Sequence, residues 1–183
     1  MAMWDRIKDQ AKSLQQPRGT QGPGAHGGGH GSESGGGSRA QLVNMLKSQL
    51  SSMKGELKSG AYRDASMAMC ALVAAADGQV DSAEQQHVES MIVSNDVLQN
   101  FPADQLRQRF NKHVDQLLAN FQMGRAEAMQ EIAKVAKKPT EARAVIQTGI
   151  VIAGSDGYFA QAEQYVIREA CAALGLRPEE FNI

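Results

Sequence analysis

Two stretches of the chain follow one pattern, in which an apolar run leads into Asp-Gly and a second run leads out. The first stretch reads ADGQVDSAEQ from Ala76, and the second reads SDGYFAQAEQ from Ser155. In both, an apolar residue stands two positions after the Gly, and a Glu stands seven positions after the Asp. A helix–loop–helix unit that occurs twice predicts a domain of two related, pseudo-symmetric halves.

The rest of the domain is predicted to be helical, because no segment after residue 39 alternates between apolar and polar residues over a strand's length. Aromatic residues make up only 5% of the chain, and a core rich in Ala, Leu, Met and Val is typical of helices. Helical spacing marks seven segments: 42–53, 62–76, those beginning at Asp81 and Pro102, 125–138, 139–155 and 160–175. The predicted fold class is all-α, a seven-helix bundle with a closing turn at 178–181.

Local signals mark several helix ends. Asp81 and Glu84 form a D-x-x-E capping box. Pro102 and Pro139 suit the first position of a helix. Gly175 predicts a left-handed helix end. The segment YRDASMAMCALVAAA is apolar nearly all round, which predicts a central helix.

Residues 1–16 are predicted to form a separate amphipathic helix. Its apolar stripe consists of Trp4, Ile7, Ala11 and Leu14. A helix this short is marginal alone in water, so the stripe needs a partner: the main domain, another protein or a membrane surface. Because the segment is only weakly basic, peripheral membrane association is a weaker expectation than docking on a protein. Trp4, Ile7 and Leu14 are therefore candidate docking residues.

Residues 17–38 are rich in Gly and predict a flexible linker between this helix and a helical domain at 39–183. Random-coil scaling places the ends of the linker on the order of 25 Å apart. His26 and His30 lie within it, but no thiol or carboxylate cluster accompanies them. They are interpreted as solvated side chains rather than metal ligands.

The spacing of the repeat matches half of a calcium-binding EF-hand loop. In such a loop Asp or Asn at position 5, Gly at 6, an apolar residue at 8 and Glu at 12 recur. Positions 1 and 3 are apolar or Gly in both copies, so neither is a complete EF-hand. The candidate ligands for Ca²⁺ or another divalent cation are Asp77, Asp81, Glu84, Asp156 and Glu163.

Turn chemistry is the alternative interpretation of the same residues. Asp77 can serve as a turn residue, and Asp81 with Glu84 can cap a helix. In the second copy Ala160 stands where the first has Asp81, and an alanine side chain cannot cap a helix. Glu163 therefore needs another use, either bonding loop amides or sharing a cation with Asp156.

Several function classes are disfavoured. Nucleic-acid-binding proteins usually carry an excess of basic residues. This chain has a net charge of −1 and a pI of about 6.4, so it does not fit that class. The two cysteines, Cys70 and Cys171, lie in apolar runs without a CxxC motif, which predicts buried reduced thiols. No nucleophile–base motif or phosphate-binding loop is present, so a non-enzyme is expected. No apolar run can span a bilayer and the N-terminus does not read as a secretory signal, so a cytoplasmic location is expected.

The chain resembles the TerB family of tellurite-resistance proteins. The resemblance rests on MWDRIKD, AAADGQVDSAEQ, PTEARAVIQTGIVIAGSDGYFAQAE and ALGLRPEEFNI. It implies a cytoplasmic helical domain that acts in tellurite and chemical stress responses. It also implies association with a TerC-type membrane protein and TerD-like calcium-binding proteins. Asp77, Glu84, Asp156 and Glu163 match the acidic loop positions proposed as metal ligands in the family, whereas Ala160 departs from the acidic character of Asp81.

The leading hypothesis is a non-enzymatic cytoplasmic interaction module that holds a cation and docks on a TerC-type complex at the inner face of the membrane. One alternative is an enzyme or redox protein that acts directly on tellurium oxyanions. A reductase of this kind would need an exposed reactive thiol or a redox cofactor. A second alternative is a metal-free structural adaptor. The oligomeric state stays open.

Overall fold

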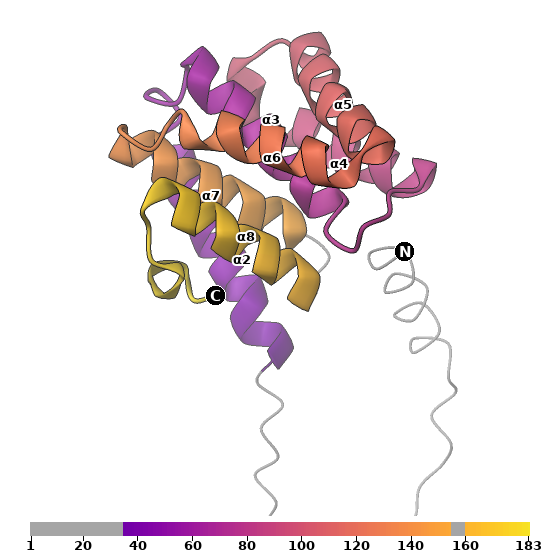
Figure 1. Ribbon diagram of the computed structural model, residues 1–183. Helices are drawn as coiled ribbons and strands as arrows, with labels where there is room; N and C mark the ends of the chain where they lie inside the picture. The colour runs from indigo at the N-terminus through magenta and orange to yellow at the C-terminus, as the bar shows by residue number, and fades with distance from the viewer. Residues whose placement is uncertain (1–34, 155–159) are drawn as a thin grey trace, which may run out of the picture.

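The computed structural model describes residues 35–154 and 160–183, and within these ranges every regular element is a helix (Figure 1). The α-helices are α2 (Gly35–Ser52), α3 (Gly60–Ala74), α4 (Ser82–Ser94), α5 (Ala103–Ala119), α6 (Phe121–Ala133), α7 (Pro139–Ala153) and α8 (Gln161–Leu174), with 3-10 turns η1 (Leu98–Asn100) and η2 (Pro178–Phe181). The predicted all-α class and its seven helices are confirmed. The predicted helix at 1–16 lies outside the described residues.

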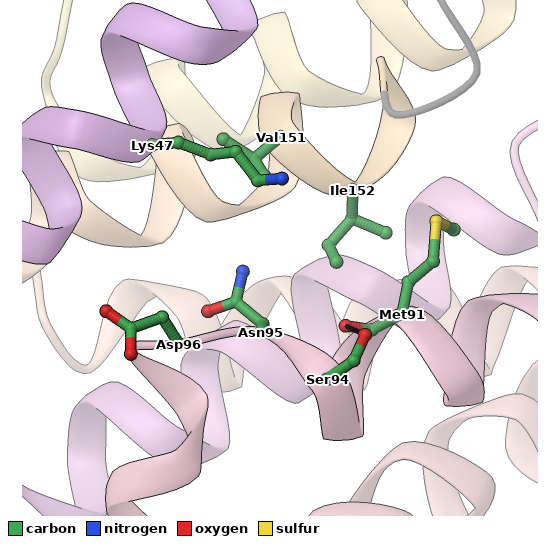
Figure 2. Close-up of a pocket in the computed structure, with 7 residues that line it drawn as sticks. All are labelled: Lys47, Met91, Ser94, Asn95, Asp96, Val151 and Ile152. Atoms are coloured by element: carbon green, nitrogen blue, oxygen red, sulfur yellow. Dashed lines mark hydrogen bonds between the residues drawn. The ribbon is translucent and has the colours of Figure 1, made fainter.

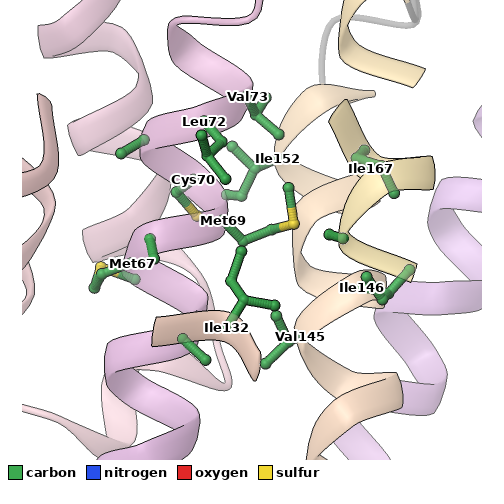
Figure 3. Packing of buried hydrophobic residues seen from close by; sticks show 14 of the residues in the cluster. Met67, Met69, Cys70, Leu72, Val73, Ile132, Val145, Ile146, Ile152 and Ile167 are labelled. Carbon is green, nitrogen blue, oxygen red and sulfur yellow. The ribbon is translucent and has the colours of Figure 1, made fainter. Parts of the chain in front are cut away.

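Helices α3 and α7 form the centre of the fold, as the apolar sequence of α3 predicts. They make the most extensive helix pair, and α3 also packs on α5, α6 and α8. Figure 3 shows Met69 of α3 lying among buried residues of α6 and α7, including Ile132 and Val145. A side chain at Gly149 would come within 2.7 Å of the Met69 Cγ, so glycine lets α7 approach α3 closely. The two repeat units are α3–α4 and α7–α8, and their first helices make this central contact.

One polar link joins α3 to α7 inside the core. The hydroxyl groups of Tyr62 and Thr148 lie 2.9 Å apart, and Thr148 donates to the Ala144 carbonyl at 2.8 Å. Burial raises the pKa of Tyr62 to about 12, so its hydroxyl stays protonated and able to donate. A fully satisfied pair of this kind holds the two helices in one register.

The corner between α4 and η1 is tied to the loop that follows α2. The Asn100 side-chain amide donates to the carbonyls of Lys54, at 2.7 Å, and Leu57, at 3.1 Å. The Lys54 ammonium pairs with the Asp96 carboxylate at 2.9 Å. The Asn95 Oδ1 atom accepts the backbone N–H of Val97 at 3.0 Å and so starts η1. These contacts fix the end of α4 beside α2.

The predicted helix ends are partly confirmed. Pro139 is the first residue of α7, and Gly175 ends α8 with a φ of 70°. Pro102 was expected as the first helical residue, but it is the cap residue, with an extended ψ of 135°, and α5 begins at Ala103. Helix α2 begins at Gly35, inside the segment assigned to the linker, because glycine propensity alone does not decide where a helix starts.

Helix α6 begins earlier than its apolar pattern predicts. It starts at Phe121 rather than near residue 125, because the Asn120 side chain caps it by accepting the Met123 N–H at 3.1 Å. Gly124 lies in the first turn of α6 and against α5, where an added Cβ would come within 2.6 Å of the Leu117 nitrogen. The glycine is required by packing and does not end the helix.

A histidine is buried between α5 and its neighbours. His113 is buried, and its Nδ1 atom makes no hydrogen bond. Burial lowers the pKa of His113, and Lys112 acts in the same direction. Glu131 and Glu127 from α6 and Asp64 from α3 oppose the shift. The neutral imidazole is therefore the form that the folded domain accommodates.

We expect acid to destabilise the domain through His113. Because its pKa is lower in the folded state than its ordinary value of 6.5, the unfolded chain binds more protons. This contribution to stability is therefore fully present above about pH 6.5 and is lost as the pH falls from there through the lower pKa of the folded state. Thermal melts between about pH 8 and 5, above the range where most carboxylates titrate, measure the slope.

The matched control is the other histidine on a described helix. His113→Gln should flatten the decline in melting temperature, whereas His87→Gln, on α4, should retain it. An identical slope in His113→Gln and the wild type would contradict the assignment.

Candidate functional site

The first Asp-Gly loop is fully described and uses its carboxylates as turn and cap groups. The Asp77 Oδ1 atom accepts the Gln79 N–H at 3.1 Å, and Gly78 adopts a φ of 85°. The Asp81 Oδ1 atom accepts the Glu84 N–H at 2.7 Å, which confirms Asp81 as the predicted cap of α4. Both hydrogen bonds agree with the interpretation of these residues as turn chemistry.

Glu84 lies at the third position of α4 and is buried, with 3% of its surface exposed. Carboxylates are rarely buried to this degree in proteins. The first turn of a helix presents N–H groups and a partial positive charge, which stabilises an anion there. The fold therefore places an acidic side chain at a buried helix N-terminus directly after the loop.

The second loop repeats this arrangement at its described end. Glu163 lies at the third position of α8, and only 2% of its surface is exposed. Ala160 is the cap residue and makes no side-chain hydrogen bond, as its sequence predicts. Asp156 lies outside the described residues, so its predicted pairing with Glu163 stays a prediction. The shared feature of the two loops is thus a buried glutamate one turn into the outgoing helix.

The cation site is not a preassembled cluster in the described part of the chain. Within residues 35–154 and 160–183, no group of three or more His, Cys, Asp or Glu side chains could hold a metal ion. Asp77, Asp81 and Glu84 all fall in these ranges. The first loop therefore offers turn and cap oxygens and one buried carboxylate rather than a convergent set of ligands.

The two thiols are buried, as predicted. Burial raises the pKa of Cys70 to about 12. It also raises the pKa of Cys171 to about 11, with a smaller contribution from Glu179 and Glu180. A thiol with a pKa this high carries almost no thiolate at neutral pH, and the thiolate is the reactive form. Neither cysteine is placed or activated for redox chemistry with a solute.

A groove that the sequence pattern does not reveal lies between α2, the end of α4 and α7. Its main pocket has a volume of about 210 Å³ and is shown in Figure 2. Met91, Val151 and Ile152 supply apolar walls, and Lys47, Ser94 and Asp96 supply polar edges. A smaller pocket of about 90 Å³ continues it and shares Lys47 and Asp96. We call the two together the α2–α4 groove; its residues come from three helices and from the turn after α4, so no local motif marks it.

The predicted docking residues Trp4, Ile7 and Leu14 lie outside the described residues. Among the helices that are described, none has both the length and the apolar character needed to cross a membrane. Docking through the N-terminal segment therefore stays a prediction.

Comparison with known proteins identifies the family. Residues 63–183, more than half of the chain, match the model of the family described as tellurite resistance protein TerB. The tellurium resistance protein TerB of Alcaligenes sp is 26% identical over 104 residues, which cover 57% of this chain and 85% of that relative. No solved structure matches the chain. The matched region spans α3 to η2 and both Asp-Gly loops, and the chain therefore belongs to the TerB family of tellurite-resistance proteins.

Proposed function

We propose that this TerB-family protein acts in tellurite resistance and the chemical stress response as a non-enzymatic cytoplasmic interaction module. The observation that carries the proposal is the pair of buried glutamates, Glu84 and Glu163, at the same position after each Asp-Gly loop. Two buried carboxylates at equivalent sites indicate a shared role in binding or loop geometry. The buried, unactivated thiols support the non-enzymatic part.

We further propose that the loops respond to a divalent cation, with Ca²⁺ favoured by all-oxygen ligands. Asp77, Asp81 and Glu84 would hold it in the first loop, and Asp156 with Glu163 in the second. The hydrogen bonds of Asp77 and Asp81 to loop amides leave the first loop already stabilised without an ion. The helix after the second loop has no capping side chain, so we expect cation binding to stabilise the second loop more than the first.

We expect Glu163→Gln to separate the cation from turn chemistry. If a cation is bound, Ca²⁺ affinity should fall at least tenfold, about 1.4 kcal/mol, because one anionic ligand is removed. Stability in chelator should hold or rise, since repulsion with Asp156 is relieved. Thermal melts in chelator and in excess Ca²⁺, with a calorimetric titration of metal-stripped protein, measure both quantities.

The matched control is Glu84→Gln, at the same position in the first loop. There the calcium shift should change less, because Asp77 and Asp81 already serve the loop amides. The contrary result is a wild type without a calcium shift and a Glu163→Gln loss of roughly 1 to 3 kcal/mol in both buffers. It would assign Glu163 to loop hydrogen bonding and favour a metal-free adaptor.

We propose that the N-terminal stripe is the docking element, with a TerC-like membrane protein and TerD-like calcium-binding proteins as partners at the inner face of the membrane. Trp4→Ala should reduce recovery of the protein with membranes that carry the TerC-type partner, because it removes the largest apolar side chain of the stripe. Co-sedimentation with such membranes measures recruitment, and a melt of each variant measures the helical domain. The fold of residues 40–183 should stay intact.

Ser13→Ala, within the same segment but not at helical spacing from the apolar stripe, is the control and should leave recruitment unchanged. A drop of several degrees in the Trp4→Ala melt would instead make the segment part of the folded core.

The alternative, direct chemistry on tellurium oxyanions, predicts a reactive thiol. Because burial holds Cys70 and Cys171 protonated, native protein should react with a maleimide far more slowly than protein unfolded in denaturant. Mass spectrometry of labelled protein measures each site. Fast labelling of either cysteine in native protein, accompanied by loss of a measured tellurite reductase activity, would favour the enzyme.

A further inference from the structure

We propose that the α2–α4 groove is an intramolecular docking site for the N-terminal segment of this chain, with the Trp4 side chain seated in its main pocket. The groove would bind the apolar stripe of the segment until another protein competes for that stripe. This inference does not depend on the proposed function, because it concerns two parts of one chain and needs no cation and no partner.

The size of the main pocket points to a side chain rather than to a cofactor. Its volume is about 210 Å³, below the roughly 300 to 1,000 Å³ of typical ligand sites. The apolar walls come from α4 and α7, and Figure 2 shows Met91 of α4 beside Ile152 of α7. A shallow apolar pocket of this size suits one large anchor residue of a docked helix.

The polar edges suit an indole in particular. The Lys47 ammonium makes no ion pair with any described residue, and Figure 2 shows its side chain extending over the pocket. An ammonium placed over an apolar pocket can interact with the face of an aromatic ring, and tryptophan gives the strongest contact of this kind. The Ser94 hydroxyl donates to the Met91 carbonyl at 3.2 Å and retains acceptor capacity for an indole N–H.

The length of chain before α2 allows the contact. Lys47 lies about 18 Å along α2 from Gly35, at 1.5 Å per residue. Residues 17–34 precede α2, and random-coil scaling, expected for their Gly-rich composition, gives a reach on the order of 25 Å. Residues 1–16 carry the apolar stripe, which includes the chain's single tryptophan. The occupant is therefore this segment and not a second copy of the domain.

The turn after α4, which forms one side of the groove, is held in place by hydrogen bonds. Asn95 fixes the end of α4 by accepting the N–H groups of Val97 and Leu98 at 3.0 and 3.2 Å. The Asp96 carboxylate accepts from Lys54 at 2.9 Å and from Ser51 at 3.2 Å, which ties this corner to α2. Docking thus requires ordering of the segment alone.

Intrinsic fluorescence of the full chain tests the proposal, because Trp4 is the only tryptophan. In wild type the emission maximum should lie at shorter wavelength than that of a peptide of residues 1–16, and acrylamide should quench it several-fold less efficiently. Ser94→Phe, which fills the pocket, should return both values toward those of the peptide. Ser48→Phe, at an exposed position on α2 that lines neither pocket, should leave the wild-type values unchanged.

A second variant protects the test against a folding defect. Ile7→Asp lies outside helices α2–α8 and should also return Trp4 to a solvent-exposed signal by disrupting the apolar stripe. Emission equal to that of the peptide in wild type, or a shifted emission that Ser94→Phe does not alter, would overturn the proposal. A shift that grows with protein concentration would also overturn it, because the contact would then lie between molecules. These measurements use the purified chain without any other protein. A negative result would therefore reject the intramolecular contact without bearing on recruitment to membranes.

Discussion

The close packing of α3 on α7 is the contact on which the rest of this domain depends. Both helices are apolar nearly all round, and Gly149 lets them approach until the Met69 side chain fills the space a Cβ would take. The buried hydroxyl pair of Tyr62 and Thr148 sets the register of the contact. Because α3 also packs on α5, α6 and α8, the positions of these other helices follow from this central pair.

The central pair also determines where the two Asp-Gly loops lie. Each loop follows one of the two central helices and precedes a helix with fewer buried residues, so the repeat in sequence becomes a repeat in structure. Glu84 and Glu163 are consequently buried in the first turns of α4 and α8. A carboxylate in this position gains from the N–H groups and dipole of the helix N-terminus, which offsets part of the cost of burial. A ligand bound in either loop would therefore act directly on the first turn of a core helix.

The two repeats are related but not equivalent. In the first, Asp77 and Asp81 satisfy loop and helix N–H groups, and the loop is complete without a further ligand. In the second, Ala160 leaves the start of α8 without a side-chain cap. The described difference between the two copies is therefore the side-chain cap at the start of the outgoing helix, which Asp81 supplies in the first copy and Ala160 cannot supply in the second.

The sequence by itself determined the all-α class, the central place of α3, the caps at Asp81 and Gly175, and the burial of both thiols. These features depend on local periodicity and on residue chemistry, which act over a few positions of the chain. Tertiary structure alone decided that Gly124 and Gly149 are needed for close helix packing, because the reason lies on a neighbouring helix. It also decided the burial of His113 and the existence of the α2–α4 groove, whose residues come from α2, α4, α7 and the turn after α4. A one-dimensional pattern cannot predict such sites, because side chains far apart in the chain meet only after the helices have packed.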